Sequence, residues 1–239
     1  MSEPLVFLPG MMCDSRLFEP QIVEFSKERM VCVAPVTGFD SIKAIASEIL
    51  EKTPPQFILA GLSLGGIIAM EMVRQAPSRI TKLILMDTNY KAELPEVSAK
   101  REQQIIAVKE GRLKEVMRNE IKPNYLNEGS EKEFILNLCM VMADNLGEQA
   151  FIDQSKALSS RYDQTETLKK VKVPTLILCG LNDRLCPVKI HEEISFLVKN
   201  STLHIIPNAG HLPTLENPKA TNGILKEWLK VIMMYLTKR

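Results

Sequence analysis

The chain has 239 residues, of which 45% are hydrophobic and 25% are charged, and its formal net charge is +1. This length suits one large α/β domain, or a core with an insert, and it buries enough apolar surface to need no disulfide or metal for stability. The near-neutral charge gives no electrostatic reason to expect nucleic acid or an anionic membrane as a partner.

The amino terminus and the cysteines indicate a cytoplasmic protein. Residues 1–9 lack a basic region, and their apolar run is too short for a signal peptide. No stretch approaches the roughly 20 apolar residues of a membrane span. The cysteine count is five, an odd number without a Cys-x-x-Cys pair, which favours free and mostly buried thiols in a reducing compartment.

Short apolar segments that recur along the chain are predicted as strands. They are continuous runs rich in Val, Ile and Leu, which are typical of a parallel sheet covered by helices on both faces. The predicted strands are Leu5–Leu8, Met30–Val33, Phe57–Ala60, Lys82–Met86, Thr175–Cys179 and Leu203–Ile206.

Helical patterns alternate with these strands. The last predicted helix has Asn217 as a candidate N-cap and Pro218 in its first position, which is a common way for a helix to begin. An alternation of strands and helices predicts βαβ units and a doubly wound sheet. The predicted helices are Asp40–Leu50, Leu64–Gln75, Val188–Leu197 and Pro218–Tyr235.

One long segment lacks a convincing strand, and apolar residues recur in it at helical spacing. We interpret residues 90–163 as a helical insert in a core formed by residues 1–89 and 164–239. Because open α/β sheets bind ligands at the carboxyl ends of their strands, we expect the insert to lie there as a lid or cap. Its predicted helices are Ser98–Arg118, Glu131–Ala143 and Gly147–Ser159.

The segment from Gly61 to Gly65 has the pattern Gly-x-Ser-x-Gly between a predicted strand and a predicted helix. A tight strand-to-helix turn at this point forces Ser63 into a strained backbone conformation. Glycines on either side avoid collisions across that turn. The pattern therefore predicts that Ser63 is a nucleophile, exposed at the top of the sheet and close to the positive end of a helix dipole.

A serine hydroxyl needs a base, and His211 is the candidate. It directly follows the strand predicted at Leu203–Ile206, so its loop emerges at the same sheet edge as Ser63. His204 lies inside that strand and His191 on a predicted helix, and we expect structural or surface roles for both.

The base needs an acid that fixes its tautomer and stabilises the imidazolium. Asp183 lies in the turn after the strand Thr175–Cys179, again at the carboxyl edge of the sheet. Asp87 competes for this role because it ends the strand Lys82–Met86. We favour Asp183, and the order Ser63, Asp183, His211 resembles the Ser-Asp-His order of α/β-hydrolases.

Three motifs in this order resemble the α/β-hydrolase superfamily. Gly61–Gly66 resembles its nucleophile elbow, and Pro174–Pro187 is similar to its acid-bearing stretch. Asn208–His211, followed by Glu216–Pro218, is similar to the histidine block of carboxylesterases, enol-lactonases and pimeloyl-carrier-protein methyl ester esterases. The resemblance implies an α/β-hydrolase fold, a mostly parallel sheet flanked by helices, with the helical cap inserted before the acid-bearing strand.

The resemblance also implies an oxyanion hole made of the backbone N–H groups of Met11 and Leu64. Many relatives carry His-Gly before the first of these residues, whereas this chain has Pro9 and Gly10. The chain begins at the position of the family's third strand, so we expect about six strands instead of eight.

These observations predict a serine hydrolase that cleaves a small or medium carboxylic ester through an acyl-enzyme, without a metal or a cofactor. The motifs do not separate this activity from action on a lactone, on a thioester or carrier-protein ester, or on a carbon–carbon bond between carbonyl groups, nor from peracid formation. Two interpretations from another class are a non-catalytic protein that binds a small molecule and a module that binds a partner through the insert. The sequence assigns no oligomeric state.

Overall fold

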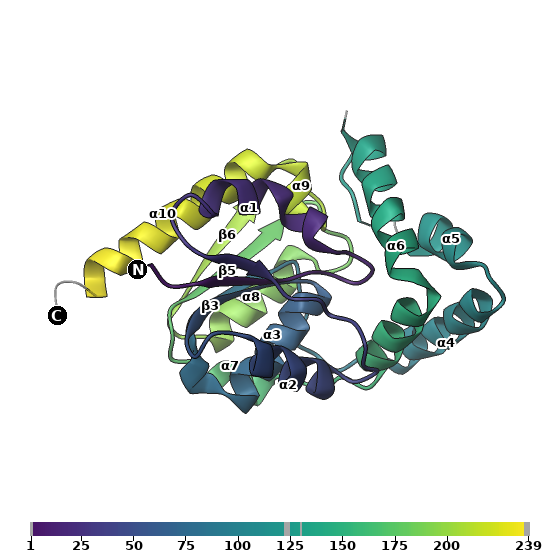
Figure 1. Ribbon diagram of the computed structural model, residues 1–239, viewed down its shortest axis with the longest axis horizontal. Coiled ribbons are helices and arrows are strands. Elements are labelled where there is room, and N and C mark those ends of the chain that lie inside the picture. The colour runs from purple at the N-terminus through teal and green to yellow at the C-terminus, as the bar shows by residue number, and fades with distance from the viewer. Residues whose placement is uncertain (1, 122–124, 130, 237–239) are drawn as a thin grey trace.

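A parallel sheet of six strands, in the order β2-β1-β3-β4-β5-β6, forms the centre of the molecule (Figure 1). The computed structural model describes residues 2–121, 125–129 and 131–236. All six predicted strands are confirmed, and their ends coincide with the prediction or differ from it by one or two residues. The strands are β1 (Leu5–Leu8), β2 (Val31–Val33), β3 (Phe57–Leu62), β4 (Ile80–Met86), β5 (Thr175–Gly180) and β6 (Ser201–Ile206).

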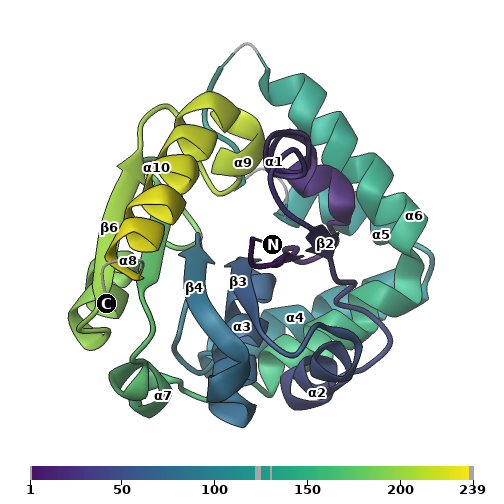
Figure 2. The same cartoon turned by 60° about the vertical axis from the view of Figure 1, so that its left-hand side comes forward.

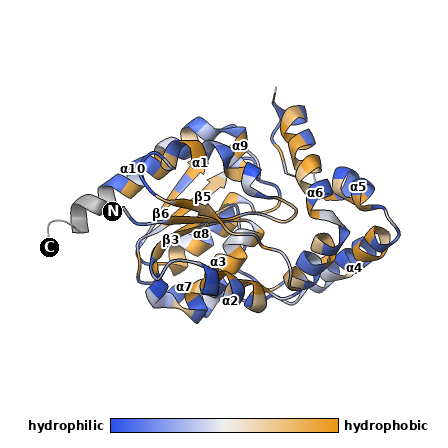
Figure 3. Ribbon diagram, in the orientation of Figure 1, coloured by the Kyte–Doolittle hydropathy of each residue, from blue (hydrophilic) through white to orange (hydrophobic). Residues whose placement is uncertain are grey.

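Helices cover both faces of the sheet because its central strands are apolar on both sides, as the hydropathy colours show (Figure 3). One face carries α1 (Glu19–Phe25), α9 (Pro213–Glu216) and α10 (Pro218–Leu236). The opposite face carries α2 (Ile42–Lys52), α3 (Leu64–Gln75), α7 (Thr165–Lys170) and α8 (Val188–Leu197). Each face has its own hydrophobic cluster, which includes Phe18 and Trp228 on the first face and Ile68 and Ile194 on the second.

The sequence patterns located the long helices more accurately than the short ones. Leu64–Gln75 and Val188–Leu197 have the predicted bounds, and α2 begins after the N-cap Ser41. The short helices α1, α7 and α9 were not predicted, because segments this short carry little periodic signal. Among the described residues, no helix is both long and apolar enough to cross a membrane. Four of the five cysteines are buried and Cys32 is exposed, which agrees with the prediction that most are buried.

The chain changes direction within the sheet between β1 and β3. From β1 it runs outward to the edge strand β2, and it then returns to place β3 on the other side of β1. The loops that follow β1 and β3 therefore leave the sheet side by side. In doubly wound sheets such a switch point, at the carboxyl ends of the strands, creates the crevice in which ligands bind.

The segment predicted as an insert, residues 90–163, contains α4 (Pro95–Lys109), α5 (Leu113–Val116), a π-helical turn η3 (Met117–Ile121) and α6 (Lys132–Ser159). Its helices lie on the opposite side of the molecule from α10 in both views (Figures 1 and 2). Val108 and Phe151 of the insert join one hydrophobic cluster of the core, and Cys139 and Met142 join the other. The insert is therefore packed against the core through apolar side chains.

Two glycines shape the insert. The prediction of one continuous helix over Ser98–Arg118 is wrong, because the chain breaks between α4 and α5 at Gly111, which has a φ of 82°. The helices predicted at Glu131–Ala143 and Gly147–Ser159 follow one another within α6, where Gly147 is non-helical, with φ 80° and ψ 178°. Glycine adopts such positive φ values at little cost, so both turns occur where glycine is present.

Candidate active site

Ser63 lies in the sharp turn between β3 and α3, in a strained conformation with φ 55° and ψ −115°. Its backbone N–H donates to the carbonyl of Met86, which ties the turn to β4 at 2.9 Å. A side chain at Gly61 would collide with the carbonyl of Gly65, and one at Gly65 would collide with the carbonyl of Leu8. Ser63 is partly exposed between buried neighbours. The predicted strained elbow is therefore present.

His211 and Asp183 are hydrogen-bonded, with 2.8 Å between His211 Nδ1 and Asp183 Oδ2. Both side chains are buried. The other carboxylate oxygen of Asp183 accepts from the backbone N–H groups of Leu185, at 2.8 Å, and Cys186, at 3.0 Å. Burial alone would raise the pKa of Asp183. The charge and hydrogen bond of His211, together with the two backbone donors, outweigh it and lower that pKa. The arrangement holds an ionised carboxylate against one ring nitrogen of His211.

The histidine loop is held from behind by Glu216, a residue of α9. Its carboxylate accepts from the backbone N–H of Gly210 at 3.0 Å and from that of Leu212 at 2.9 Å. These two N–H groups flank His211 on either side. The sequence motif placed Glu216 in the histidine block, but only the structure shows that its side chain binds the loop.

A segment of the insert contacts the same loop. The backbone N–H of His211 donates to the carbonyl of Tyr125 at 2.6 Å, and the two rings lie 5.1 Å apart between centroids. The N–H of Asn127 donates to Glu216 at 2.6 Å. A side chain at Gly210 would come within 2.7 Å of the Tyr125 carbonyl. The insert thus contributes to the position of His211.

Ser63 and His211 both follow strands at the carboxyl edge of the sheet, Ser63 after β3 and His211 after β6. Among the described residues there is no hydrogen bond between Ser63 Oγ and the ring of His211, whose hydrogen bond is to Asp183. Catalytic hydrogen bonds in ligand-free enzymes are often long and tighten only with substrate bound. The structure therefore brings Asp183 and His211 into contact and places Ser63 at the same edge.

Asp87, the other candidate for the acid, is hydrogen-bonded to β5, the strand that precedes Asp183. It is fully buried, and its Oδ1 accepts from the N–H of Gly180 at 2.8 Å. Burial first, and the carboxylate of Asp183 second, raise the pKa of Asp87 well above its ordinary value. The other oxygen of Asp87, Oδ2, is buried and has no hydrogen-bond partner among the described residues. The structure pairs His211 with Asp183, whereas Asp87 accepts from the N–H of Gly180.

Thr88, which the sequence did not single out, also supports the elbow. Thr88 Oγ donates to the carbonyl of Ser63 at 2.8 Å, and the N–H of Thr88 donates to Nε2 of His191 at 3.0 Å. Burial lowers the pKa of His191 to about 4, so its ring stays neutral and accepts that hydrogen bond. His191 on α8 is therefore structural, as expected, and His204 is half-buried in β6. The only sequence signal for Thr88 is its place after a strand.

The loop after β1 lies directly against the elbow. A Cβ added to Gly10 would lie 3.4 Å from the Cβ of Ser63. The next residue, Met11, has a backbone N–H with no acceptor among the described residues. Leu64 begins α3, and the N–H of a first helical residue has no carbonyl partner within its own helix. Both predicted oxyanion donors thus lie close to Ser63 in sequence or in space.

Asp183, Cys186 and His211 are the described residues that could offer a metal ion three ligand atoms, since one such atom of each lies within 4.8 Å of the others. In the structure, however, the carboxylate of Asp183 is occupied by three hydrogen bonds, one of them from the ring of His211.

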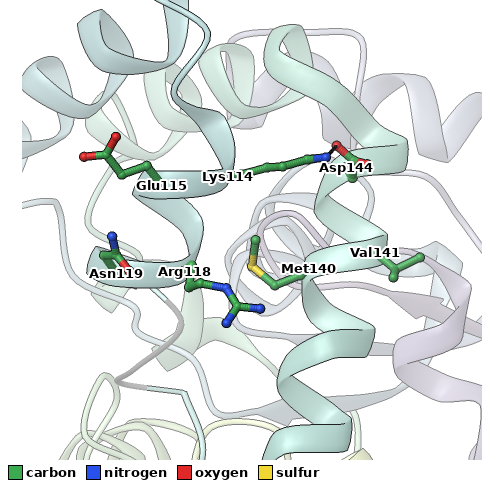
Figure 4. A pocket seen from close by; sticks show the side chains of 7 residues that line it. All are labelled: Lys114, Glu115, Arg118, Asn119, Met140, Val141 and Asp144. Atoms are coloured by element: carbon green, nitrogen blue, oxygen red, sulfur yellow. Dashed lines mark ion pairs between the residues drawn. The ribbon is translucent and has the colours of Figure 1, made fainter.

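A separate pocket of about 410 Å³ lies in the insert between α5, η3 and α6 (Figure 4). An ion pair between Lys114 and Asp144, at 3.2 Å, spans it. None of its lining residues belongs to the site formed by Ser63, Asp183 and His211. They are Lys114, Glu115, Arg118, Asn119, Met140, Val141 and Asp144.

Comparison with known proteins identifies the fold family. The family model described as the alpha/beta hydrolase family matches residues 5–224. The chain belongs to this family, and the predicted membership is confirmed.

Individual relatives are distant but extend over most of the chain. A pimeloyl-[acyl-carrier protein] methyl ester esterase from Pectobacterium carotovorum is 24% identical, over 90% of each chain. The biotin biosynthesis bifunctional protein BioHC of Teredinibacter turnerae is 25% identical over 98% of this chain, which spans only 46% of that protein. A thermophilic esterase from Thermogutta terrifontis superposes with a TM-score of 0.88 at 24% identity, covering 97% of this chain and 91% of the esterase.

Proposed function

We propose that this protein is a serine carboxylesterase that cleaves small or medium carboxylic esters with Ser63, His211 and Asp183. The observation that carries the proposal is the 2.8 Å hydrogen bond between His211 and Asp183 at the sheet edge that bears the strained Ser63. The comparisons support it, because the Pectobacterium relative is named a methyl ester esterase and the Thermogutta structure is that of an esterase.

The reaction proceeds by acyl transfer. His211 takes the proton of Ser63 as Oγ attacks the carbonyl carbon, and Asp183 stabilises the imidazolium that forms. The N–H groups of Met11 and Leu64 bind the oxyanion, and removal of such a donor typically costs a factor of about 100–1,000 in kcat. His211 then gives its proton to the leaving alcohol, and it later activates the water that releases the acid.

The insert, residues 90–163, acts as a cap over this site. Its contacts with the histidine loop and its apolar packing on the core support this role. The partner is a small ester or acyl compound, and the odd number of cysteines without a Cys-x-x-Cys pair favours the cytoplasm as the protein's compartment.

The test is hydrolysis of p-nitrophenyl esters from acetate to decanoate by the wild type and Ser63→Ala, with fluorophosphonate labelling in parallel. We expect activity and labelling that both disappear in Ser63→Ala while the fold is retained. The acyl chain length that is hydrolysed fastest then indicates the size of the site that binds the acyl group.

Other outcomes separate the alternatives. Labelling of Ser63 without hydrolysis of any ester would point to a lactone, carrier-bound or carbon–carbon substrate. A folded wild type that shows neither turnover nor labelling would refute the proposal and favour a binding protein.

A further inference from the structure

The loop after β1 forms a tight turn whose third residue has an unfavourable backbone conformation. The N–H of Cys13 donates to the carbonyl of Gly10 at 3.1 Å, so Met11 and Met12 are the central residues of a β-turn. Met12 has a φ of 54°, and Met11 is not among the residues with positive φ. This combination is that of a type II turn, which strongly prefers glycine at its third position. A methionine there needs an external contact to hold it.

That contact comes from Gln154 of α6, which is 142 residues away in the chain and fully buried. Its Oε1 accepts from the N–H of Met12 at 2.9 Å, and its Nε2 donates to the carbonyl of Val36 at 3.0 Å. One partner can only donate and the other can only accept, so the amide has a single orientation. The side chain bridges the loops that follow β1 and β2.

The orientation of the central peptide distinguishes a type II turn from a type I turn. In this turn the peptide joins Met11 to Met12, and its N–H is the group that Gln154 binds. The side chains of Pro9, Gly10 and the two methionines carry no oxygen that could accept from the N–H of Met12 in place of Gln154. With Cys13 bound to Gly10 and Met12 bound to Gln154, the turn presents the N–H of Met11 without an acceptor among the described residues.

From these contacts we infer that Gln154 is a positioning residue for catalysis, which holds the Gly10–Cys13 turn so that the N–H of Met11 is directed at the oxyanion. The inference rests on the proposed function of Ser63 and Met11. The insert then takes part in the chemical step, because Gln154 of α6 sets the position of the Met11 N–H, which belongs to the core. An oxyanion donor displaced by about 1 Å can cost about 100-fold in rate.

The experiment compares Gln154→Met with Gln164→Met. Gln164 is also a buried glutamine, but it contacts Glu71 and Thr167 and does not touch the turn. We expect Gln154→Met to lower kcat for a p-nitrophenyl ester about 10–100-fold with little change in KM. Affinity for a trifluoromethyl ketone, whose adduct with Ser63 carries an oxyanion, should fall by a similar factor. Gln164→Met should keep both values within about twofold of the wild type, as expected for a substitution away from the site.

Gln154→Glu provides a second readout. A neutral glutamic acid can accept from Met12 and donate to Val36, whereas an ionised one cannot donate. Its kcat relative to that of the wild type should therefore rise as the pH is lowered. If Gln154→Met fails to fold, the test is the ratio of kcat for Gln154→Glu to kcat for the wild type. A ratio independent of pH would overturn the inference.

Three results would contradict the role of Gln154: a folded Gln154→Met with wild-type kcat, a loss confined to KM, or an unchanged affinity for the ketone. Failure of the proposed function is recognised separately, by a wild type without Ser63-dependent turnover. In that case amide hydrogen exchange tests whether Gln154 holds the turn. Exchange in the Gly10–Cys13 turn should be faster in Gln154→Met than in Gln164→Met, and equal rates would refute it.

Discussion

The carboxylate of Glu216 accepts a hydrogen bond from the backbone N–H of Gly210, the residue that precedes the proposed base, at 3.0 Å. The same carboxylate binds the N–H of Leu212 on the other side of His211 and that of Asn127 in the insert. A single side chain thus holds the loop of the base and connects it to the insert.

Substitution of Glu216 by alanine leaves these backbone donors without their acceptor. We expect Glu216→Ala to lower the free energy of unfolding by about 2–4 kcal/mol and kcat by at least about tenfold. Urea denaturation and ester hydrolysis measure the two effects. The control is Glu227→Ala, at an exposed glutamate of α10, and an equally small effect at both positions would show that Glu216 does not hold the loop.

Asp87 and Asp183 should respond differently to the same change. Because the pKa of Asp87 is raised, its folded form resists ionisation, and stability is lost as the pH rises from the ordinary value of 3.8 through the raised pKa. Asp87→Asn keeps an acceptor for Gly180, so it should retain most activity and be less destabilised than the wild type at high pH.

Asp183→Asn should instead reduce kcat by about 10⁴, because the amide favours the wrong tautomer of His211. Esterase assays and urea denaturation from pH 5 to 9 measure both variants. If Asp87→Asn loses as much activity as Asp183→Asn, the acid has been assigned to the wrong residue.

His191 should make the protein sensitive to acid. Its pKa is about 4 in the fold, against 6.5 when unperturbed, since burial disfavours the charged ring. The unfolded chain therefore binds the proton first, and stability is lost as the pH falls from about 6.5 to about 4. A shift of this size corresponds to about 3 kcal/mol.

The measurement is the free energy of unfolding between pH 7 and 4, in the wild type and in His191→Gln. The glutamine oxygen can accept from Thr88 but does not titrate, so the variant should show a shallower dependence on pH. Parallel curves for the two proteins would mean that other groups cause the loss.

Gly65 should not tolerate a side chain, because a Cβ there would meet the backbone of Leu8 at the end of β1. We expect Gly65→Ala to lower the free energy of unfolding by about 2–4 kcal/mol and to remove most activity, since the elbow must shift. Gly223→Ala is the matched control, with open space around it in α10. It should raise stability by about 0.5–1 kcal/mol. Thermal melting and esterase activity test the pair.

The elements that the sequence predicted well are those specified by local patterns. The six strands are continuous apolar runs, and α3 and α8 have the predicted bounds. The elbow at Ser63 was predicted because its glycines stand at the two positions where a Cβ collides with backbone. The insert helices were less predictable, because a glycine such as Gly111 is compatible with several backbone conformations and only the fold selects one.

The sequence by itself therefore determined the class of fold, the order of its strands and helices along the chain, and the residue types that can form a triad. Only the tertiary structure decided that His211 binds Asp183 and not Asp87, that Glu216 holds the histidine loop, and that Gln154 binds the turn after β1. The physical reason is that these hydrogen bonds join polar groups brought together by burial. Residues such as Gln154 and Met12 are 142 positions apart, and no local pattern records which buried donor each acceptor will meet.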